Sequence, residues 1–569
     1  MRRLTLLVVL LACGCGDGAD PDAGPRDAGP RDAGTDAGTD AGPTPDRVVT
    51  ACDEVVLEGA AAAGVPALEG WPLLFAEARG ADAVFRAPAV ARPTFLTVGE
   101  TVLRVDPRAP DAFDVPGLAA DCGSFQHGVA SGDPRADGVV LWTRWTPDEP
   151  VASATLEWTV ATDPALASVV ASGTAEATPD ADWTVRVAVD GLSPSTTYYY
   201  RFADPDGTAS ALGRTRTAAV DATHLRFAVA SCSSLYSGWF NAYRRIAERD
   251  GLDLVIHLGD YIYDFVDEDE PVRVPPSGEV EDPSDLAGHR RRHAQYLADP
   301  DLRLARRAHP WFLLWDNHDL VRGAPSFGGG AQAFREWNPI RPPADGAPPE
   351  VLYRRLSYGA LADVFAVDMY LFQGRDTLPG GAPSALGDAQ YAWLTGELGA
   401  STATWRILGM QKVFAPLGPF SGWNDFEGAR DRLLAFFVDE GIGDNLFLTG
   451  DSHFTAFMDV AGDGPVGGEL LASSISRGNF DEQLGEDSAR FIESIRDGYL
   501  RDNPHHVDLE LTSHGYGLVD VRSERLVAEM WYSPIRGPAG AERFGGAYAI
   551  ERGANRYDRT RVDAPTAPD

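Results

Sequence analysis

Four short apolar runs in the C-terminal two-thirds of the chain each lead into residues with metal-binding side chains. Continuous apolar runs of four to eight residues between polar or turn residues are typical of strands buried on both faces. We therefore predict four central strands whose carboxyl ends all carry functional groups. The runs cover residues 225–230, 254–258, 311–315 and 445–449.

Helical patterns alternate with these strands, which favours an α/β fold with functional side chains on the loops that follow the strands. We assign this α/β domain to residues 221–534 and expect residues 535–569 to form a C-terminal tail. The predicted helices cover residues 239–249, 289–299, 301–308, 389–398 and 429–439.

Residues 123–220 show a different pattern, with short β-rich segments separated by turn residues. This pattern predicts an all-β domain of fibronectin or immunoglobulin type, and a role in binding carbohydrate or cell wall stays open. The β-rich segments cover residues 138–143, 155–161, 183–189, 197–202 and 213–218.

The N-terminus has the pattern of a targeting segment. Two arginines precede an apolar run that is too short to span a membrane, which predicts a signal peptide over residues 1–12. The sequence Leu-Leu-Ala-Cys before and at Cys13 resembles a bacterial lipobox, so Cys13 is the predicted lipidation site and membrane anchor. Cys15 is a competing acceptor, and a secretory signal without lipid is a further alternative. We expect an exported bacterial protein that is lipid-anchored, periplasmic or extracellular.

Residues 13–47 repeat Asp-Ala-Gly and contain too few apolar residues to fold, so we expect a disordered tether. Residues 48–122 combine an alanine-rich run at 57–79, predicted as a helix, with strand-like segments. Cys52 and Cys122 flank this uncharacterised segment. In an exported protein they are expected to form a disulfide, which would stabilise the fold by roughly 4 kcal/mol; two unpaired buried thiols are the alternative.

Composition limits the choice of partners. The 84 acidic and 49 basic residues give a formal charge of −35, which argues against binding to a nucleic-acid backbone. The hydrophobic content of 44% is ordinary for a globular protein. Because the chain carries a large negative net charge, an anionic substrate would need local positive charge at its site, such as a bound metal ion.

The residues after the four strands form two groups of metal ligands. The Cys232 thiolate, the Tyr263 phenolate and the His453 imidazole suit a trivalent redox-type metal, whereas Asn317 and Asp451 offer harder oxygens for a second, divalent ion. The carboxylate of Asp260 can bridge both. Two metals about 3.5 to 4 Å apart can hold a phosphoryl group for in-line attack, so this set predicts a phosphoester hydrolase.

His318 follows Asn317 directly, and neighbouring residues in an extended loop face different ways. It can therefore face the substrate and act as a general acid, which is worth about 10² to 10⁴ in rate. A structural histidine that only supports the ligands is the alternative.

Three motifs carry a family resemblance: Gly-Asp-x-x-Tyr at 259–263, Asn-His-Asp at 317–319 and Asp-x-His at 451–453. Together they resemble the signature of binuclear metallophosphoesterases. Cys232, where that superfamily usually has aspartate, narrows the match to the PhoD-type alkaline phosphatases. Further agreement runs from about Phe125 to about Trp531 and includes the segments 125–134, 141–144 and 514–516.

This resemblance implies a metallophosphoesterase β-sandwich flanked by helices. It implies Fe³⁺ held by Cys232, Asp260, Tyr263 and His453, and Ca²⁺ held by Asp260, Asn317 and Asp451, although another divalent pair stays possible. A metal-bound hydroxide would attack phosphate monoesters, diesters or both. The protein is expected to be a monomer.

Two other functions stay open. A non-catalytic surface-binding lipoprotein could retain the fold, but its ligand positions would be expected to erode, and all six are present. A hydrolase acting on other esters is also possible, because Tyr370 stands where the family commonly has arginine.

Overall fold

The computed structural model describes residues 124–147, 151–265, 272–273, 283–321, 327–343, 348, 350–418, 420, 422–485, 488–537 and 540–566. It also describes the backbone of nine short strands, β1 to β9, between residues 47 and 121.

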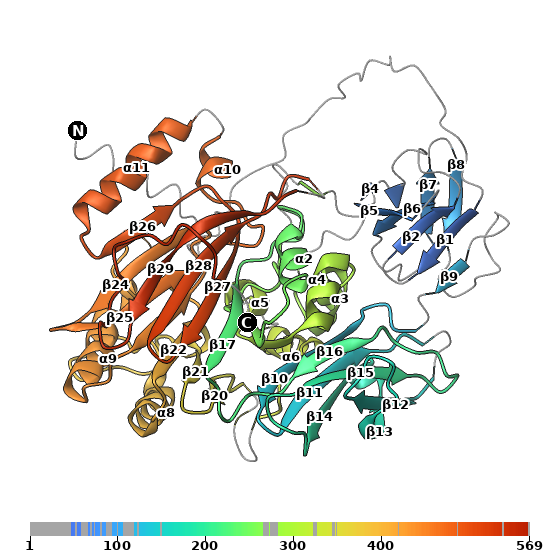
Figure 1. Ribbon diagram of the computed structural model, residues 1–569, viewed down its shortest axis with the longest axis horizontal. Coiled ribbons are helices and arrows are strands. Elements are labelled where there is room, and N and C mark those ends of the chain that lie inside the picture. The colour runs from blue at the N-terminus through green and yellow to red at the C-terminus, as the bar shows by residue number, and fades with distance from the viewer. Residues whose placement is uncertain are drawn as a thin grey trace.

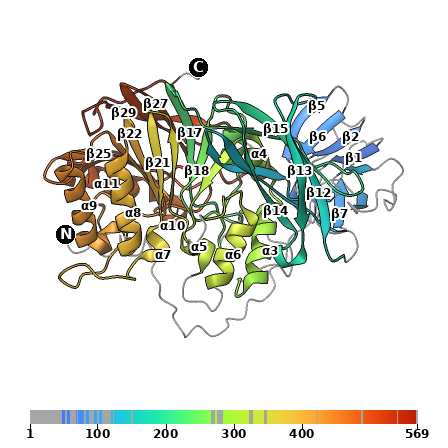
Figure 2. The same ribbon diagram turned by 90° about the horizontal axis from the view of Figure 1, so that it is seen from below.

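Two large sheets form the body of the molecule, as the ribbon views show (Figures 1 and 2). The nine-stranded sheet has the order β14 (Thr184–Asp190), β11 (Gly138–Arg144), β10 (Val129–Arg135), β19 (Pro310–Leu313), β18 (Leu254–His257), β17 (His224–Ala230), β27 (Gly515–Arg522), β28 (Arg525–Tyr532), β29 (Arg543–Glu551). The seven-stranded sheet has the order β20 (Arg354–Tyr358), β21 (Ala362–Val367), β22 (Trp405–Met410), β23 (Asn445–Thr449), β25 (Pro465–Leu471), β24 (Thr455–Ala461), β26 (His506–Glu510).

The two sheets share one hydrophobic core. Val255 and Leu518 of the first sheet belong to the same buried cluster as Ile407 and Leu446 of the second. The other face of the seven-stranded sheet packs against helices, which lie outside that sheet in both views (Figures 1 and 2). The fold is therefore mixed α/β, as expected. The covering helices are α8 (Gly387–Ala400), α9 (Glu427–Asp439) and α11 (Ala489–Asp502).

The four predicted central strands are confirmed as β17, β18, β19 and β23. The first three are parallel neighbours, because Ala230 pairs with His257 and His257 pairs with Leu313. The predicted helices are present within a few residues of their expected bounds. They are α2 (Asn241–Ala247), α3 (Leu286–Tyr296), α4 (Pro300–Ala308), α8 and α9.

The N-terminal β-rich part forms a smaller sandwich. Strands β10, β11 and β14 share a core with a four-stranded sheet. Strand β10 pairs in parallel with β19 through Ser131 and Pro310, so the nine-stranded sheet continues across the boundary expected at residue 221. The four-stranded sheet has the order β13 (Val169–Ala177), β12 (Ala154–Ala161), β15 (Thr197–Ala203), β16 (Gly213–Arg216).

The helix predicted over residues 57–79 is wrong, because this stretch contributes to β2 (Glu54–Glu58) and β5 (Leu74–Arg79). Both strands pair with β6 (Asp82–Arg86), one on each side. The helix preference of alanine is a fraction of a kcal/mol per residue, and cross-strand pairing overrides it here.

The segment expected as a C-terminal tail also differs, since β29 pairs with β28 along the sheet edge.

Cys13, Cys52 and Cys122 lie outside the described residues. Strands β1 (Arg47–Ala51) and β9 (Ala119–Asp121) pair in parallel with Ala51 opposite Asp121, so the pairing reaches the residue before each of the two later cysteines.

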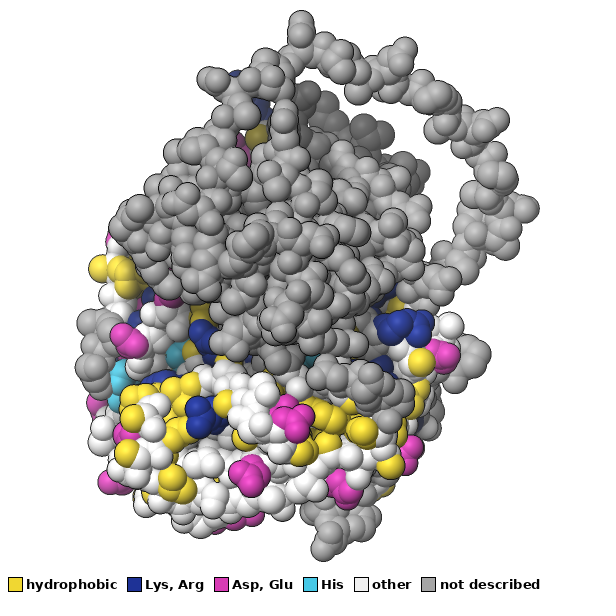
Figure 3. Space-filling model, turned by 90° about the vertical axis from the view of Figure 1, so that its right-hand side faces the viewer, with side chains coloured by type: hydrophobic (Ala, Val, Ile, Leu, Met, Phe, Trp, Pro, Cys, Tyr) yellow, Lys and Arg dark blue, Asp and Glu magenta, His cyan; other side chains and the backbone are white. Residues whose placement is uncertain are grey.

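On the described part of one face, the basic and the acidic side chains are scattered, and neither kind forms a continuous patch (Figure 3). Among the helices of the described ranges, none combines the length and apolar character needed to cross a bilayer.

Candidate metal centre

The six predicted ligands lie on loops at the carboxyl ends of four strands. Because β17, β18 and β19 are parallel neighbours and β23 belongs to the facing sheet, these loops meet at one end of the sandwich. Cys232 follows β17, Asp260 and Tyr263 follow β18, Asn317 begins the short helix α5 (Asn317–Leu320) after β19, and Asp451 and His453 follow β23.

Two glycines allow these loops to approach one another. A Cβ atom at Gly259 would lie 2.7 Å from Cβ of Asp316, and one at Gly450 would lie 2.8 Å from Cβ of Ser231. Both distances are shorter than real carbon contacts. The backbone N–H of Cys232 also donates to the Gly259 carbonyl at 3.2 Å, which fixes the first loop against the second.

Four of the six predicted ligands have left-handed backbone. The φ angle is +56° at Cys232, +53° at Asp260, +67° at Asp451 and +66° at His453. Such a conformation in a residue other than glycine costs on the order of 1 kcal/mol or more and persists where the surrounding structure enforces it. These turns direct the side chains into a common space at the strand ends.

The predicted ligands of the trivalent ion lie close together and form the softer half of the site. They are Cys232, Asp260, Tyr263 and His453. The Asp260 carboxylate lies 3.8 Å from the Cys232 sulfur and 3.3 Å from the Tyr263 hydroxyl, measured to the same oxygen, Oδ2. The Tyr263 hydroxyl in turn lies 3.2 Å from His453 Nε2. All four side chains are buried, so one ion could contact a sulfur, a nitrogen and two oxygens.

The imidazole of His453 is prepared for ligation. Its Nδ1 lies 3.0 Å from the Gly478 carbonyl, which can only accept, so Nδ1 carries the hydrogen and Nε2 faces the site with a lone pair. Burial, aided by the nearby charge of Arg477, lowers the pKa of His453 well below its usual value. The ring is therefore neutral, as a metal ligand must be.

The thiol of Cys232 needs a cation to ionise. Burial, and then the negative charges of Asp260 and Asp451, raise its pKa well above the usual range. A bound metal ion would reverse this balance and favour the thiolate. The four residues of the softer half therefore fit a transition metal by position and by donor type.

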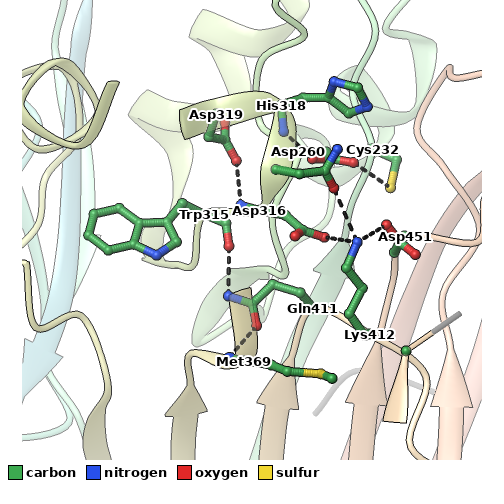
Figure 4. A network of polar contacts seen from close by, with 12 residues as sticks. Cys232, Asp260, Trp315, Asp316, His318, Asp319, Met369, Gln411, Lys412 and Asp451 are labelled. Atoms are coloured by element: carbon green, nitrogen blue, oxygen red, sulfur yellow. Dashed lines mark hydrogen bonds and ion pairs between the residues drawn. The ribbon is translucent and has the colours of Figure 1, made fainter. Parts of the chain in front are cut away.

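The harder half also converges, but around a different group. One carboxylate oxygen from each of Asp260, Asp316 and Asp451 lies within 4.8 Å of the others. The ammonium of Lys412 lies 3.1 Å from Asp316 Oδ2 and 3.1 Å from Asn317 Oδ1, and it bonds directly to Asp451 Oδ1 (Figure 4). These oxygens surround an ammonium group at the position that the family resemblance assigns to a second metal ion.

Asp319 holds two of the loops together. Its carboxylate accepts hydrogen bonds from the backbone N–H of Asp316 at 2.9 Å and of Ile262 at 3.0 Å. Burial, and then the charge of Asp260, raise the pKa of Asp319 to about 8. This residue therefore connects the loop after β18 to the loop after β19.

His318 lies at the edge of this cluster. Its Nδ1 is 2.6 Å from Asp264 Oδ1, and its ring stacks on Tyr263 with 4.3 Å between ring centres. Its backbone N–H donates to Asp260 Oδ1 at 3.2 Å. The carboxylate fixes the ring through Nδ1, so Nε2 is the nitrogen from which a proton could be delivered.

Comparison with known proteins places this geometry in a family. The family described as PhoD-like phosphatase matches residues 227–321 and 328–530, and its N-terminal domain matches residues 115–219. The chain belongs to the PhoD-like phosphatases. Alkaline phosphatase D of Bacillus subtilis (strain 168) is 32% identical over 441 residues, which cover 67% of this chain and 73% of that protein. The solved structure of PhoD matches with a TM-score of 0.68 at 28% identity, covering 78% of this chain and 93% of the other.

Family membership at this level shows that this PhoD-like phosphatase is a phosphoric ester hydrolase and that metal binding belongs to its function. Sequence reasoning assigned no site role to two cationic residues. Lys412 lies two residues after the end of β22, at the same end of the sandwich as the other loops. Arg477 follows β25, and its guanidinium lies 5.7 Å from the ring centre of Tyr263. The sequence showed only that each of these cationic residues follows a buried strand. Lysine and arginine at such positions are commonly solvent-exposed, so this pattern did not mark them as site residues.

Proposed function

We propose that this enzyme hydrolyses phosphate monoesters, diesters or both at the cluster of Cys232, Asp260, Tyr263 and His453, with a ferric ion as its metal. The observation that carries the proposal is the convergence of these four buried side chains on one Asp260 oxygen and one His453 nitrogen. A thiolate and a phenolate together favour a trivalent ion over calcium or magnesium, which prefer all-oxygen sites. When bound, such an ion would lower the pKa of water and neutralise charge on a phosphoryl oxygen.

The protein's own residues divide the remaining work. His318 delivers a proton from Nε2 to the leaving oxygen while Asp264 holds the ring. Arg477, which also lies 5.1 Å from the ring centre of Phe265, adds positive charge beside the site and binds phosphoryl oxygens. The second position, beside Asp260, Asn317 and Asp451, needs positive charge as well, for which the family resemblance predicts calcium.

We retain three further assignments as predictions. Export with lipidation of Cys13 is inferred from residues 1–46, which the structure does not describe. The immunoglobulin-like or fibronectin-like type of the N-terminal sandwich is supported by its two facing sheets and shared core. The monomeric state is inferred from sequence only.

The test of the metal assignment is elemental analysis of the purified protein combined with its visible spectrum. We expect about one iron per chain and a visible charge-transfer band from the thiolate and phenolate ligands. Cys232→Ser should lose iron and activity on p-nitrophenyl phosphate and its bis-ester, while its circular dichroism stays unchanged. Full iron occupancy in that variant would contradict the assignment.

Ser234→Ala is a matched control. It removes a buried hydroxyl from the same loop that bonds only to Ser237 at 2.7 Å among the contacts described, and it should keep its iron.

A further inference from the structure

The position of Lys412 is exceptional for this chain. It is the only lysine among 569 residues, although the chain has 49 lysine and arginine residues in total. Its side chain is only 12% exposed, and lysine is rarely buried unless it is paired. A compact ammonium, rather than the planar guanidinium used elsewhere in the protein, therefore occupies this position.

The surroundings of the ammonium match its bonding capacity. An ammonium has three N–H donors and no acceptor. Three oxygens surround it: Asp316 Oδ2 at 3.1 Å, Asn317 Oδ1 at 3.1 Å and Asp451 Oδ1 in direct contact. Two of these three residues, Asn317 and Asp451, are the ones that the family resemblance assigns to calcium.

The backbone that carries Lys412 is fixed on both sides. The side chain of the preceding residue, Gln411, donates to the Trp315 carbonyl at 2.7 Å and accepts from the Met369 backbone at 3.0 Å (Figure 4). The Gln411 carbonyl also accepts from the backbone N–H of Gly450 at 2.9 Å, which joins β22 to the loop of Asp451. This framework directs the lysine stem into the site.

A calcium ion would compete with this ammonium for the same oxygens. Calcium binds six to eight oxygens at about 2.3 to 2.6 Å. The side chain of Asn317 offers only one oxygen, and that oxygen already accepts from Lys412 at 3.1 Å. Calcium would also bring two positive charges beside the positive charge of the lysine. The oxygens of this half therefore serve one cation at a time.

We propose that the Lys412 ammonium takes the place of the second metal ion, so that this enzyme works with one metal ion and one built-in ammonium. This inference rests on the proposed function, because it concerns the second cation position of the same site. It implies that the enzyme needs no calcium and that chelating calcium leaves its activity unchanged.

The test measures metal stoichiometry in the purified full chain after equilibration with excess calcium and desalting. We expect the wild-type protein to hold about one iron and less than about 0.1 calcium per chain, whereas Lys412→Met should bind about one calcium per chain. This is a rise of roughly tenfold in calcium content. Lys412→Gln is a second variant that keeps a polar group at the site and should behave like Lys412→Met.

The control is Arg216→Met. It removes a cation of β16 that pairs with Asp253 at 3.0 Å, and it should gain no calcium. A wild-type protein with iron plus one calcium, lost in Asp451→Asn, would overturn the inference and leave the proposed function intact. Failure of both folded Lys412 variants to bind calcium would also overturn it. Absence of iron from the wild-type protein would instead contradict the proposed function.

Discussion

The role of His318 can be isolated by varying the leaving group of the substrate. Nitrophenolate leaves readily without a proton, whereas an alkoxide needs one. Removing a general acid costs about 10² to 10⁴ in rate, which corresponds to roughly 3 to 5 kcal/mol of transition-state stabilisation. His318→Ala should therefore lose that factor on alkyl phosphates and less than about tenfold on nitrophenyl phosphate.

The hydrogen bond between His318 and Asp264 predicts how much a substitution of Asp264 should reduce the rate. A hydrogen bond of 2.6 Å to a carboxylate is charge-assisted, and such bonds are worth roughly 1.5 to 3 kcal/mol. Asp264→Asn should consequently reduce turnover of alkyl phosphates by about ten- to a hundredfold, with the same selectivity. This residue acts through the imidazole ring and positions it.

The assay compares kcat on the two substrate classes and the iron content of each variant. Phe265→Leu is the packing control, because Phe265 contacts the His318 ring edge-on at 5.2 Å without carrying a proton. It should slow both classes alike. Equal losses in His318→Ala on both classes would refute proton donation, and loss of iron would place His318 among the metal ligands.

Three further outcomes are expected. Cys13→Ala should move the protein from the detergent phase to the soluble fraction, and a mature N-terminus without lipid mass would contradict the anchor. If Cys52 and Cys122 are paired, intact mass should rise by about 2 Da on reduction and the unreduced, unfolded chain should show neither thiol to maleimide; removing the bond should cost roughly 4 kcal/mol. Burial raises the pKa of Glu469 from 4.5 to about 7, so its stabilising contribution is complete below pH 4.5 and is lost as the pH rises through 7. The contribution that is lost amounts to roughly 3 kcal/mol. The slope of unfolding free energy against pH over that interval should flatten in Glu469→Gln, and an unchanged slope would contradict this role of Glu469.

The central strands and the ligand loops could be predicted because their signals are local. An apolar run that ends in Gly-Asp or Ser-Cys indicates both the strand and the turn after it. Residues such as Asp260 are therefore identifiable without knowing which strands are neighbours. The same holds for His318, whose position next to Asn317 in the sequence already suggested a different orientation.

Lys412 could not be predicted in the same way. Its role depends on β22 lying beside β23 and on Gln411 bonding to Trp315, and both are contacts between distant parts of the chain. The strand β29 was missed for a related reason, since its partner β28 decides its structure. The helix over residues 57–79 was wrongly predicted because the local alanine content favours a helix. Strand pairing with β6, which this local pattern does not show, decides the structure of this stretch.

The parallel pairing of β10 with β19 has a consequence for dividing this protein into pieces. A fragment that begins at residue 221 would lack β10 and would leave the backbone N–H and C=O groups of β19 exposed along an open sheet edge. Open edges of this kind template intermolecular pairing and aggregation. The N-terminal sandwich thus covers the edge of β19 with strand β10. We expect the two parts to unfold in a single cooperative transition and to be expressed well only together.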